Sequence, residues 1–194
     1  DVLINNAGIM PVGLFSQESD ETTARQVEIN INGVIFGSKL ALERMLPRNS
    51  GHIVNIASQA GKVGIPGIAT YSATKHAVVG LSEALRGELR ETNIEVTCVM
   101  PVLVNTELTS GLKPARGMKN AEPQDVADAI VDALEVPRFD VSVPPSALRI
   151  HTAVSLLPRK AREAVARAMR VDKLMYDVDD SARGAYESRI AEEP

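Results

Sequence analysis

Apolar positions along the chain follow two alternating patterns. Short runs of β-branched and other apolar residues predict four strands, at Val2 to Asn5, His52 to Ala57, Ile94 to Met100 and Phe139 to Val143. Longer segments between them place apolar residues at helical spacing, which predicts helices over Thr22 to Met45, Ser72 to Glu91 and Pro123 to Leu134. This alternation is typical of βαβ units, and strands without polar alternation are covered on both faces. The pattern therefore predicts an α/β fold with a parallel sheet.

The pattern changes after Pro144-Pro145, where arginine and alanine become frequent. Two weakly amphipathic helices are predicted there, at about Ser155 to Arg170 and Ser181 to Glu192. We expect residues 1–145 to form the main domain and residues 146–194 a helical C-terminal extension. The extension is basic and amphipathic, so it could lie on an anionic membrane, cover a site, or pack on its own domain with its arginines in solvent.

Composition excludes several classes of protein. The chain has 194 residues, 44% hydrophobic and 24% charged, which suits one folded domain and not a disordered or fibrous chain. The net charge of -4 disfavours a nucleic-acid binder, which needs a basic footprint. A single cysteine, Cys98, and an apolar start without a leader pattern predict a reducing, cytoplasmic compartment. No apolar run reaches the ~20 residues that span a bilayer.

The segment Tyr71-Ser72-Ala73-Thr74-Lys75 carries the strongest chemical signal. On a helix, Tyr71 and Lys75 lie four residues apart on one face and can contact a common ligand. A neighbouring ammonium favours the phenolate, so we expect Lys75 to lower the tyrosine pKa and the pair to be able to deprotonate an alcohol. The spacing alone is weak evidence, since a half-buried tyrosine beside a solvated lysine would share it.

Further polar residues follow the predicted strands. Ser58 comes after the second strand, and Asn5-Asn6-Ala7-Gly8 ends the first, at the edge where open α/β sheets bind ligands. Asn30 stands inside a predicted helix, although asparagine prefers caps and turns.

Taken in order, these motifs resemble the short-chain dehydrogenase/reductase family, whose members are Rossmann-fold oxidoreductases that use NAD or NADP. The resemblance covers Asp1 to about Val143. It rests on Asn5-Asn6-Ala7-Gly8, Ile29-Asn30, Gly51 to Ser58, Tyr71 to Lys75 and Pro101 to Thr106. It implies a doubly wound parallel sheet and hydride transfer between a nicotinamide cofactor and an alcohol or ketone.

The resemblance also implies roles for four residues. Tyr71 would be the general acid/base, and Ser58 would hydrogen-bond the reacting oxygen. Lys75 would hold the nicotinamide ribose and lower the tyrosine pKa. Asn30 would hold a water that links Lys75 to solvent.

On the cofactor side, the resemblance assigns Asn5, Ala7 and Gly8 to the wall near the adenosine ribose. Tyr71 and Lys75 also belong to this set, and Pro101, Val104 and Thr106 would approach the nicotinamide amide and the phosphates. Where the family usually has glycine after that proline, this chain has Val102, which cannot follow glycine to positive φ and adds bulk. The choice between NAD and NADP is not readable, because the family reads the ribose after a strand that these residues do not include.

Two loops are expected to choose the substrate. One is Ala60 to Thr70, and the other is Glu107 to Ala121, apolar at Leu108, Leu112 and Met118 and typical of a mobile lid. An apolar alcohol or ketone, such as a lipid or steroid, would suit them.

The resemblance implies a homo-oligomer as well, because the family commonly assembles through its two long helices. Here these are Thr22 to Met45 and Ser72 to Glu91, and Gly80, Ala84 and Gly87 would permit close approach.

Two tempting patterns are discounted. Gly61-x-x-Gly64-x-x-Gly67 lacks the spacing of a phosphate-binding glycine motif. The three histidines, His52, His76 and His151, lack ligand spacing, so we expect no metal site.

The family's fold begins with a strand, a glycine-rich turn and a helix that holds the pyrophosphate, and no such turn occurs in these residues. We therefore expect oxidoreductase function in a parent protein, and expect these residues alone not to bind a dinucleotide productively. The alternative is a truncated or non-catalytic fragment of the same fold that acts as a binding or structural module.

Overall fold

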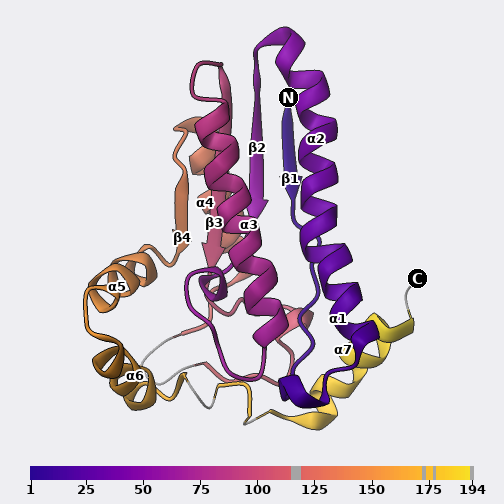
Figure 1. Cartoon of the computed structure of the whole chain (residues 1–194), viewed down its shortest axis with the longest axis vertical. Coiled ribbons are helices and arrows are strands. Elements are labelled where there is room, and N and C mark those ends of the chain that lie inside the picture. Colours follow the sequence, from indigo (N-terminus) through magenta and orange to yellow (C-terminus); the bar gives the residue numbers. More distant parts are fainter. Residues whose placement is uncertain (115–118, 172–173, 177, 193–194) are drawn as a thin grey trace.

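Four parallel strands form one sheet in the computed structural model, which describes residues 1–114, 119–171, 174–176 and 178–192 (Figure 1). They lie side by side in sequence order: β1 (Val2–Asn5), β2 (Gly51–Ile56), β3 (Ile94–Pro101) and β4 (Asp140–Val143). The register pairs Ile4 with Val54, and Val54 with Thr97. The predicted strands are confirmed to within one residue at each end.

Helices cover both faces of the sheet. Because successive strand residues point to opposite faces, Ile53 packs toward α2 (Gly33–Met45) and α3 (Ala69–Glu88), whereas Val54 packs toward α4 (Pro123–Glu135). The side chains of Ile53 and Val54 are both fully buried. The predicted fold class, a Rossmann-type α/β fold with a parallel sheet covered on both faces, is confirmed.

The first long helix is not regular along its length. The structure divides the predicted Thr22 to Met45 helix into α1 (Asp20–Val27), a π-helical turn η2 (Glu28–Asn32) and α2. Such single wide turns occur often at functional sites. Here the turn is centred on Asn30, the residue that sequence reasoning singled out.

Three helices follow the sheet: α5 (Pro145–Ser155), α6 (Arg159–Ala168) and α7 (Asp180–Glu192). The prediction of one helix from Ser155 to Arg170 is wrong at its start, because Pro158 caps α6 and a separate helix begins directly at Pro145. Figure 1 shows α5 and α6 beyond the end of β4, with α7 returning to the side of α1. The division at residue 145 stays a prediction.

Short 3-10 helices lie in the connections: η1 (Phe15–Gln17), η3 (Leu46–Arg48), η4 (Gln59–Gly61) and η5 (Glu107–Thr109). Strand β1 is an edge of the sheet, and its Val2 and Ile4 are 48% and 44% exposed. Among the described helices, none is both long enough and apolar enough to cross a membrane.

Candidate active site

A cavity of about 780 Å³ opens at the carboxyl ends of β1, β2 and β3. Its wall includes Ala7 and Gly8 after β1, Ser58 after β2, and Tyr71 and Lys75 from α3. Pro101, Val104 and Thr106, which follow β3, also line it. The structure therefore brings together all the predicted site residues except Asn5 and Asn30, which lie outside the lining.

Tyr71 and Lys75 face the cavity from the first turns of α3, as their four-residue spacing requires. Tyr71 is 7% exposed and Lys75 is 4% exposed. The Lys75 Nζ lies 5.6 Å from the centre of the Tyr71 ring and donates a hydrogen bond to the Ile56 carbonyl oxygen at 2.8 Å. This bond fixes the ammonium beside the end of β2.

Burial dominates the electrostatics of both groups. It raises the pKa of Tyr71 to about 12, while a hydrogen bond from Ser58 works in the opposite direction and nearby Tyr186 adds to the rise. Burial also lowers the pKa of Lys75 to about 8. The expectation that the tyrosine pKa falls is therefore wrong for this structure, because loss of solvent outweighs the stabilisation of the phenolate.

Ser58 connects the end of β2 to Tyr71. It begins η4, where its Oγ accepts a hydrogen bond from the backbone N–H of Ala60 at 3.1 Å. The same side chain lowers the pKa of the Tyr71 phenol, against the larger effect of burial. Ser58 and Tyr71 can thus both approach one ligand oxygen.

Asn30 is fully buried and holds the loop after β1 through hydrogen bonds to its backbone. Its Oδ1 accepts from the Ile9 N–H at 2.8 Å, and its Nδ2 donates to the Ile9 carbonyl at 2.9 Å and to Thr74 Oγ1 at 3.2 Å. Both amide hydrogens are therefore used, and one lone pair of Oδ1 remains for a further partner.

Gly8 lies between Asn30 and Lys75. A Cβ at this position would sit 3.2 Å from Asn30 Oδ1 and 3.6 Å from Lys75 Nζ. The missing side chain leaves both polar atoms open to a common small group, which suits the close approach of a ligand to the backbone.

Asn5 takes part in a polar chain across the sheet. Its Nδ2 donates to Asn55 Oδ1 at 2.8 Å and to Ser38 Oγ at 3.2 Å, and Asn55 Nδ2 donates to Ser82 Oγ at 2.9 Å. The chain ties α2, β1, β2 and α3 together beneath the cavity. The neighbouring Asn6 lines the cavity, whereas Asn5 does not. A contact of Asn5 with a cofactor therefore stays a prediction.

Val102 does not require the conformation that glycine would allow. It is absent from the described non-glycine residues with positive φ, and its N–H donates to the Val143 carbonyl at 2.9 Å. Its side chain lines the cavity and packs against the cluster beneath α4. The substitution therefore adds bulk to the wall without a backbone penalty.

Two of the three glycines after β2, Gly61 and Gly67, serve close packing. A Cβ on Gly61 would lie 2.7 Å from the Lys75 carbonyl oxygen, and one on Gly67, whose φ is +87°, would lie 2.6 Å from Met175 Cβ. Gly64 has no neighbour within 4 Å of such an atom. Gly61 thus lets the Ser58 loop approach the backbone of α3.

The extension supplies one wall of the cavity, which is among the placements that the sequence left open for it, although the lining residues themselves were not identified. The lining includes Ile150 and Val154 of α5 and Val165 of α6. Met169 and Met175, which follow α6, also belong to it. Met175 is 3% exposed and packs with Tyr71 and Met10. The signal available in the sequence was Pro145, a residue suited to a first helical turn.

The predicted substrate loops also meet here. Ile65 and Ile68 line the cavity from the first loop, and Leu108 lines it from the second, while Leu112 packs beside Tyr71. Met118 lies outside the described residues. His151 lines the cavity and contacts the Lys62 carbonyl through Nε2 at 3.2 Å, and no group of metal-ligating side chains occurs among the described residues.

Comparison with known proteins agrees with this geometry. An uncharacterized oxidoreductase of Staphylococcus aureus (strain MRSA252) is 36% identical over 138 residues, which are 71% of this chain and 59% of that protein. A short chain dehydrogenase/reductase from Burkholderia phymatum, solved in complex with NAD, superposes with a TM-score of 0.67 at 28% identity, over 78% of this chain and 63% of that one. ElxO with NADP bound superposes with a TM-score of 0.68 at 31% identity, over 73% of this chain and 64% of that one.

The chain thus spans about three fifths of the length of the relative that it matches. The family profile of short chain dehydrogenases matches residues 1–117, which contain β1 to β3 and every residue of the Ser58, Tyr71 and Lys75 cluster. The chain belongs to the short-chain dehydrogenase family.

Proposed function

We propose that the protein is an NAD(P)-dependent oxidoreductase that acts on an apolar alcohol or ketone. The observation that carries the proposal is the convergence of Ser58, Tyr71 and Lys75 on one cavity at the carboxyl ends of the strands. The NAD and NADP complexes of the two similar structures support the cofactor class.

The residues present fit the nicotinamide ribose end of the cofactor, and productive binding of the whole dinucleotide is expected of the parent protein. Gly8 leaves room beside Lys75 Nζ and Asn30 Oδ1, and the ammonium has donors beyond its bond to Ile56. Lys75 would hold the ribose hydroxyls, with Ala7 and Gly8 forming one side and Pro101, Val104 and Thr106 the other. When bound, the cofactor supplies or accepts the hydride.

The chain's own residues would carry out the proton transfer to the substrate oxygen. With a pKa of about 12, Tyr71 keeps its proton at neutral pH and can donate it to a carbonyl oxygen. Ser58 would donate a hydrogen bond to the same oxygen and stabilise its developing charge. Lys75, with a pKa of about 8, is mostly charged at neutral pH and would stabilise the negative charge that develops on Tyr71 as the phenol gives up its proton. Asn30 Oδ1 would hold a water between Lys75 and solvent.

The side chains around Tyr71 indicate the substrate class. Met10, Ile68, Leu112 and Met175 pack against it, and the wall beyond is built from α5 and α6. A polar substrate would lose its hydration there without gaining matching partners. An apolar alcohol or ketone therefore fits this cavity.

Replacing Tyr71 by phenylalanine tests the assignment. In the full-length parent protein Tyr71→Phe removes the phenol oxygen alone, and we expect kcat for ketone reduction to fall by ~10² to 10⁴-fold with most of the cofactor affinity kept. The exposed Tyr176, 52% accessible, provides a matched control in Tyr176→Phe. A panel of apolar ketones with NADH and NADPH is the assay, and near-normal turnover by Tyr71→Phe would contradict the mechanism.

The alternative is a binding or structural module that keeps the fold without catalysis. It predicts saturable binding of an apolar ligand, no turnover by the wild type on any member of the panel, and equal ligand affinity in Tyr71→Phe. The same panel therefore separates the two functions. A reducing, cytoplasmic location fits both, and it rests on the free, buried Cys98.

We also propose that a second copy of the chain covers α2 and α3. Phe36 and Leu40 are 54% and 58% exposed on α2, and Gly80 and Gly87 on α3 have open space beside them. Sedimentation should show a homo-oligomer that Leu40→Glu weakens and Val136→Glu, at an exposed valine elsewhere, leaves intact. A concentration-independent monomer would contradict this.

The turn between α5 and α6 supports peripheral membrane contact. Leu156 is 83% exposed there, and the basic Arg159 and Lys160 follow it. We expect the protein to float with vesicles that contain an anionic lipid and Leu156→Glu to abolish this, with Val136→Glu as the control. Absence of flotation by the wild type would remove the membrane from the proposal.

A further inference from the structure

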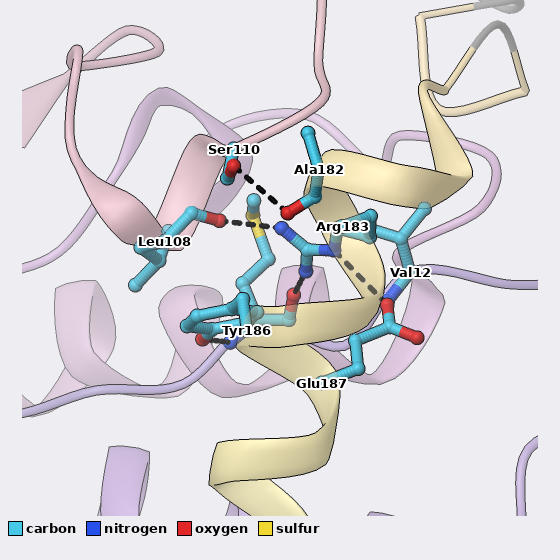
Figure 2. A network of polar contacts seen from close by, with 8 residues as sticks. Val12, Leu108, Ser110, Ala182, Arg183, Tyr186 and Glu187 are labelled. Carbon is cyan, nitrogen blue, oxygen red and sulfur yellow. Dashed lines mark hydrogen bonds and ion pairs between the residues drawn. The ribbon is translucent and has the colours of Figure 1, made fainter.

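Helix α7 carries a buried arginine that bridges two loops of the active site. The Arg183 side chain is 4% exposed, and its Nη1 donates to the Leu108 carbonyl at 2.7 Å while its Nη2 donates to the Met10 carbonyl (Figure 2). Met10 belongs to the loop after β1, and Leu108 belongs to η5 after β3. One guanidinium thus joins segments that leave two different strands.

Neighbouring residues of α7 strengthen the same bridge. Tyr186 accepts a hydrogen bond from the Met10 N–H at 3.0 Å, and the Ala182 carbonyl accepts one from Ser110 Oγ at 3.0 Å. The Arg183 guanidinium lies 4.5 Å from the centre of the Tyr186 ring and pairs through Nε with Glu187 at 3.0 Å. Figure 2 shows these contacts gathered around the arginine, which is therefore held from several sides.

The bridged loops are walls of the active-site cavity. Met10 and Leu108 both line it, and the Met10 side chain is 2% exposed and packs against Tyr71. Ile9, one residue earlier, is held through its backbone by Asn30. The loop after β1 is consequently fixed on one side by the π-helical turn and on the other by α7.

Arginine suits this position for a physical reason. Its planar guanidinium presents several N–H donors in fixed directions, so it can bond two carbonyls on separate segments at once. A lysine ammonium is a single point of charge on a flexible chain and cannot hold the same two acceptors in a fixed relation. Removal of the arginine would leave both buried carbonyls without these donors.

We propose that Arg183 is a positioning residue that holds the loop after β1 and the loop after β3 at a fixed separation across the cavity, and thereby sets the affinity for substrate. The part that concerns substrate rests on the proposed function. Arg183 does not line the cavity, so it acts through Met10 and Leu108. Ser58 follows β2 and caps η4, and Tyr71 and Lys75 stand on α3, so none of the three belongs to this bridge.

The first test needs no activity. Hydrogen exchange followed by mass spectrometry compares the wild type with Arg183→Met, which keeps an unbranched apolar side chain but has no donors. We expect residues 9–12 and 105–112 to exchange faster together, with β2 and β3 unchanged. Faster exchange in α7 alone, or uniformly along the chain, would overturn the bridge.

The second test separates positioning from chemistry. In steady-state assays we expect Arg183→Met to raise the substrate KM by about 10-fold with kcat within about 3-fold of the wild type, since the bridge orients walls and not the proton-transfer groups. Arg183→Lys should recover only part of the affinity. An unchanged KM, or a loss confined to kcat, would contradict the positioning role.

Arg189→Met is the matched control on the same helix. Arg189 is 47% exposed and pairs with Glu107 at the surface, where an ion pair contributes little. An equal effect of both variants would assign the change to the charge of α7 and overturn the role of the buried guanidinium. If the full-length parent protein has no activity, the proposed function fails, and the exchange experiment still decides whether Arg183 holds the two loops.

Discussion

Burial of the Lys75 ammonium should make the stability of the protein depend on pH in a predictable direction. Burial lowers the Lys75 pKa from 10.5 to about 8 in the folded state. Between these two values the unfolded chain binds more protons than the folded one, so the free energy of unfolding rises with pH. Integrating the two titrations from pH 7 to pH 10 gives a gain on the order of 2 to 3 kcal/mol. Lys75 is only 4% exposed, so solvent screening removes little of it.

The Lys75→Met variant lacks this titration and should therefore lose the gain. At pH 7 the buried lysine is charged, and its burial lowers the free energy of unfolding of the wild type. At pH 10 the buried amine is neutral, and most of this free energy is regained. The unpaired Ile56 carbonyl in the variant adds a cost of ~1 to 3 kcal/mol, which does not depend on pH and shifts both ends equally.

Urea unfolding followed by far-UV circular dichroism measures the difference between wild type and variant at several pH values. The exposed Lys39 gives a matched control in Lys39→Met, which makes the same substitution at the surface. A difference that stays flat between pH 7 and pH 10, or that falls, would refute the reasoning.

Two further substitutions probe the frame beneath the site. Gly61→Ala should cost ~1 to 3 kcal/mol in urea unfolding because its Cβ would meet the backbone of Lys75, whereas Gly64→Ala, with open space, should be neutral or stabilising by up to ~1 kcal/mol. Met175→Ala should lower the free energy of unfolding by ~2 to 5 kcal/mol and shift the whole cooperative transition, since this residue packs with Tyr71; a separate early transition would show instead that the extension unfolds by itself.

The strands and the convergence of the candidate site residues could be predicted because local chemistry decides them. Runs such as Ile53-Val54 indicate a strand covered on both faces, and the structure buries both side chains completely. The spacing of Tyr71 and Lys75 fixes their common face once a helix forms. Ser58 follows because the carboxyl ends of parallel strands meet at one edge of the sheet.

The electrostatics of that cluster could not be predicted in the same way. Charge proximity, visible in the sequence, favours a lower Tyr71 pKa, yet the structure raises it to about 12. The deciding quantity is how completely the phenol is removed from water, and this depends on Met10, Leu112 and Met175, which come from three distant segments. The π-helical turn at Asn30 could not be predicted from the sequence either, because the Asn30 amide gains its partners Ile9 and Thr74 only after the chain has folded.

The role of α7 shows why a terminal extension is hard to interpret from residue types. Whether an arginine is solvated or buried depends on the acceptors that other segments leave unpaired, and those of Arg183 are the backbone carbonyls of Met10 and Leu108. Any residue type at these two positions would offer the same oxygen atoms, so no side-chain pattern marks them. They are free to accept because the chain leaves β1 and β3 in irregular loops, and such loops form where a parallel sheet meets its ligand. The same irregular backbone that makes room for a substrate thus creates the need for donors from outside, and α7 provides them.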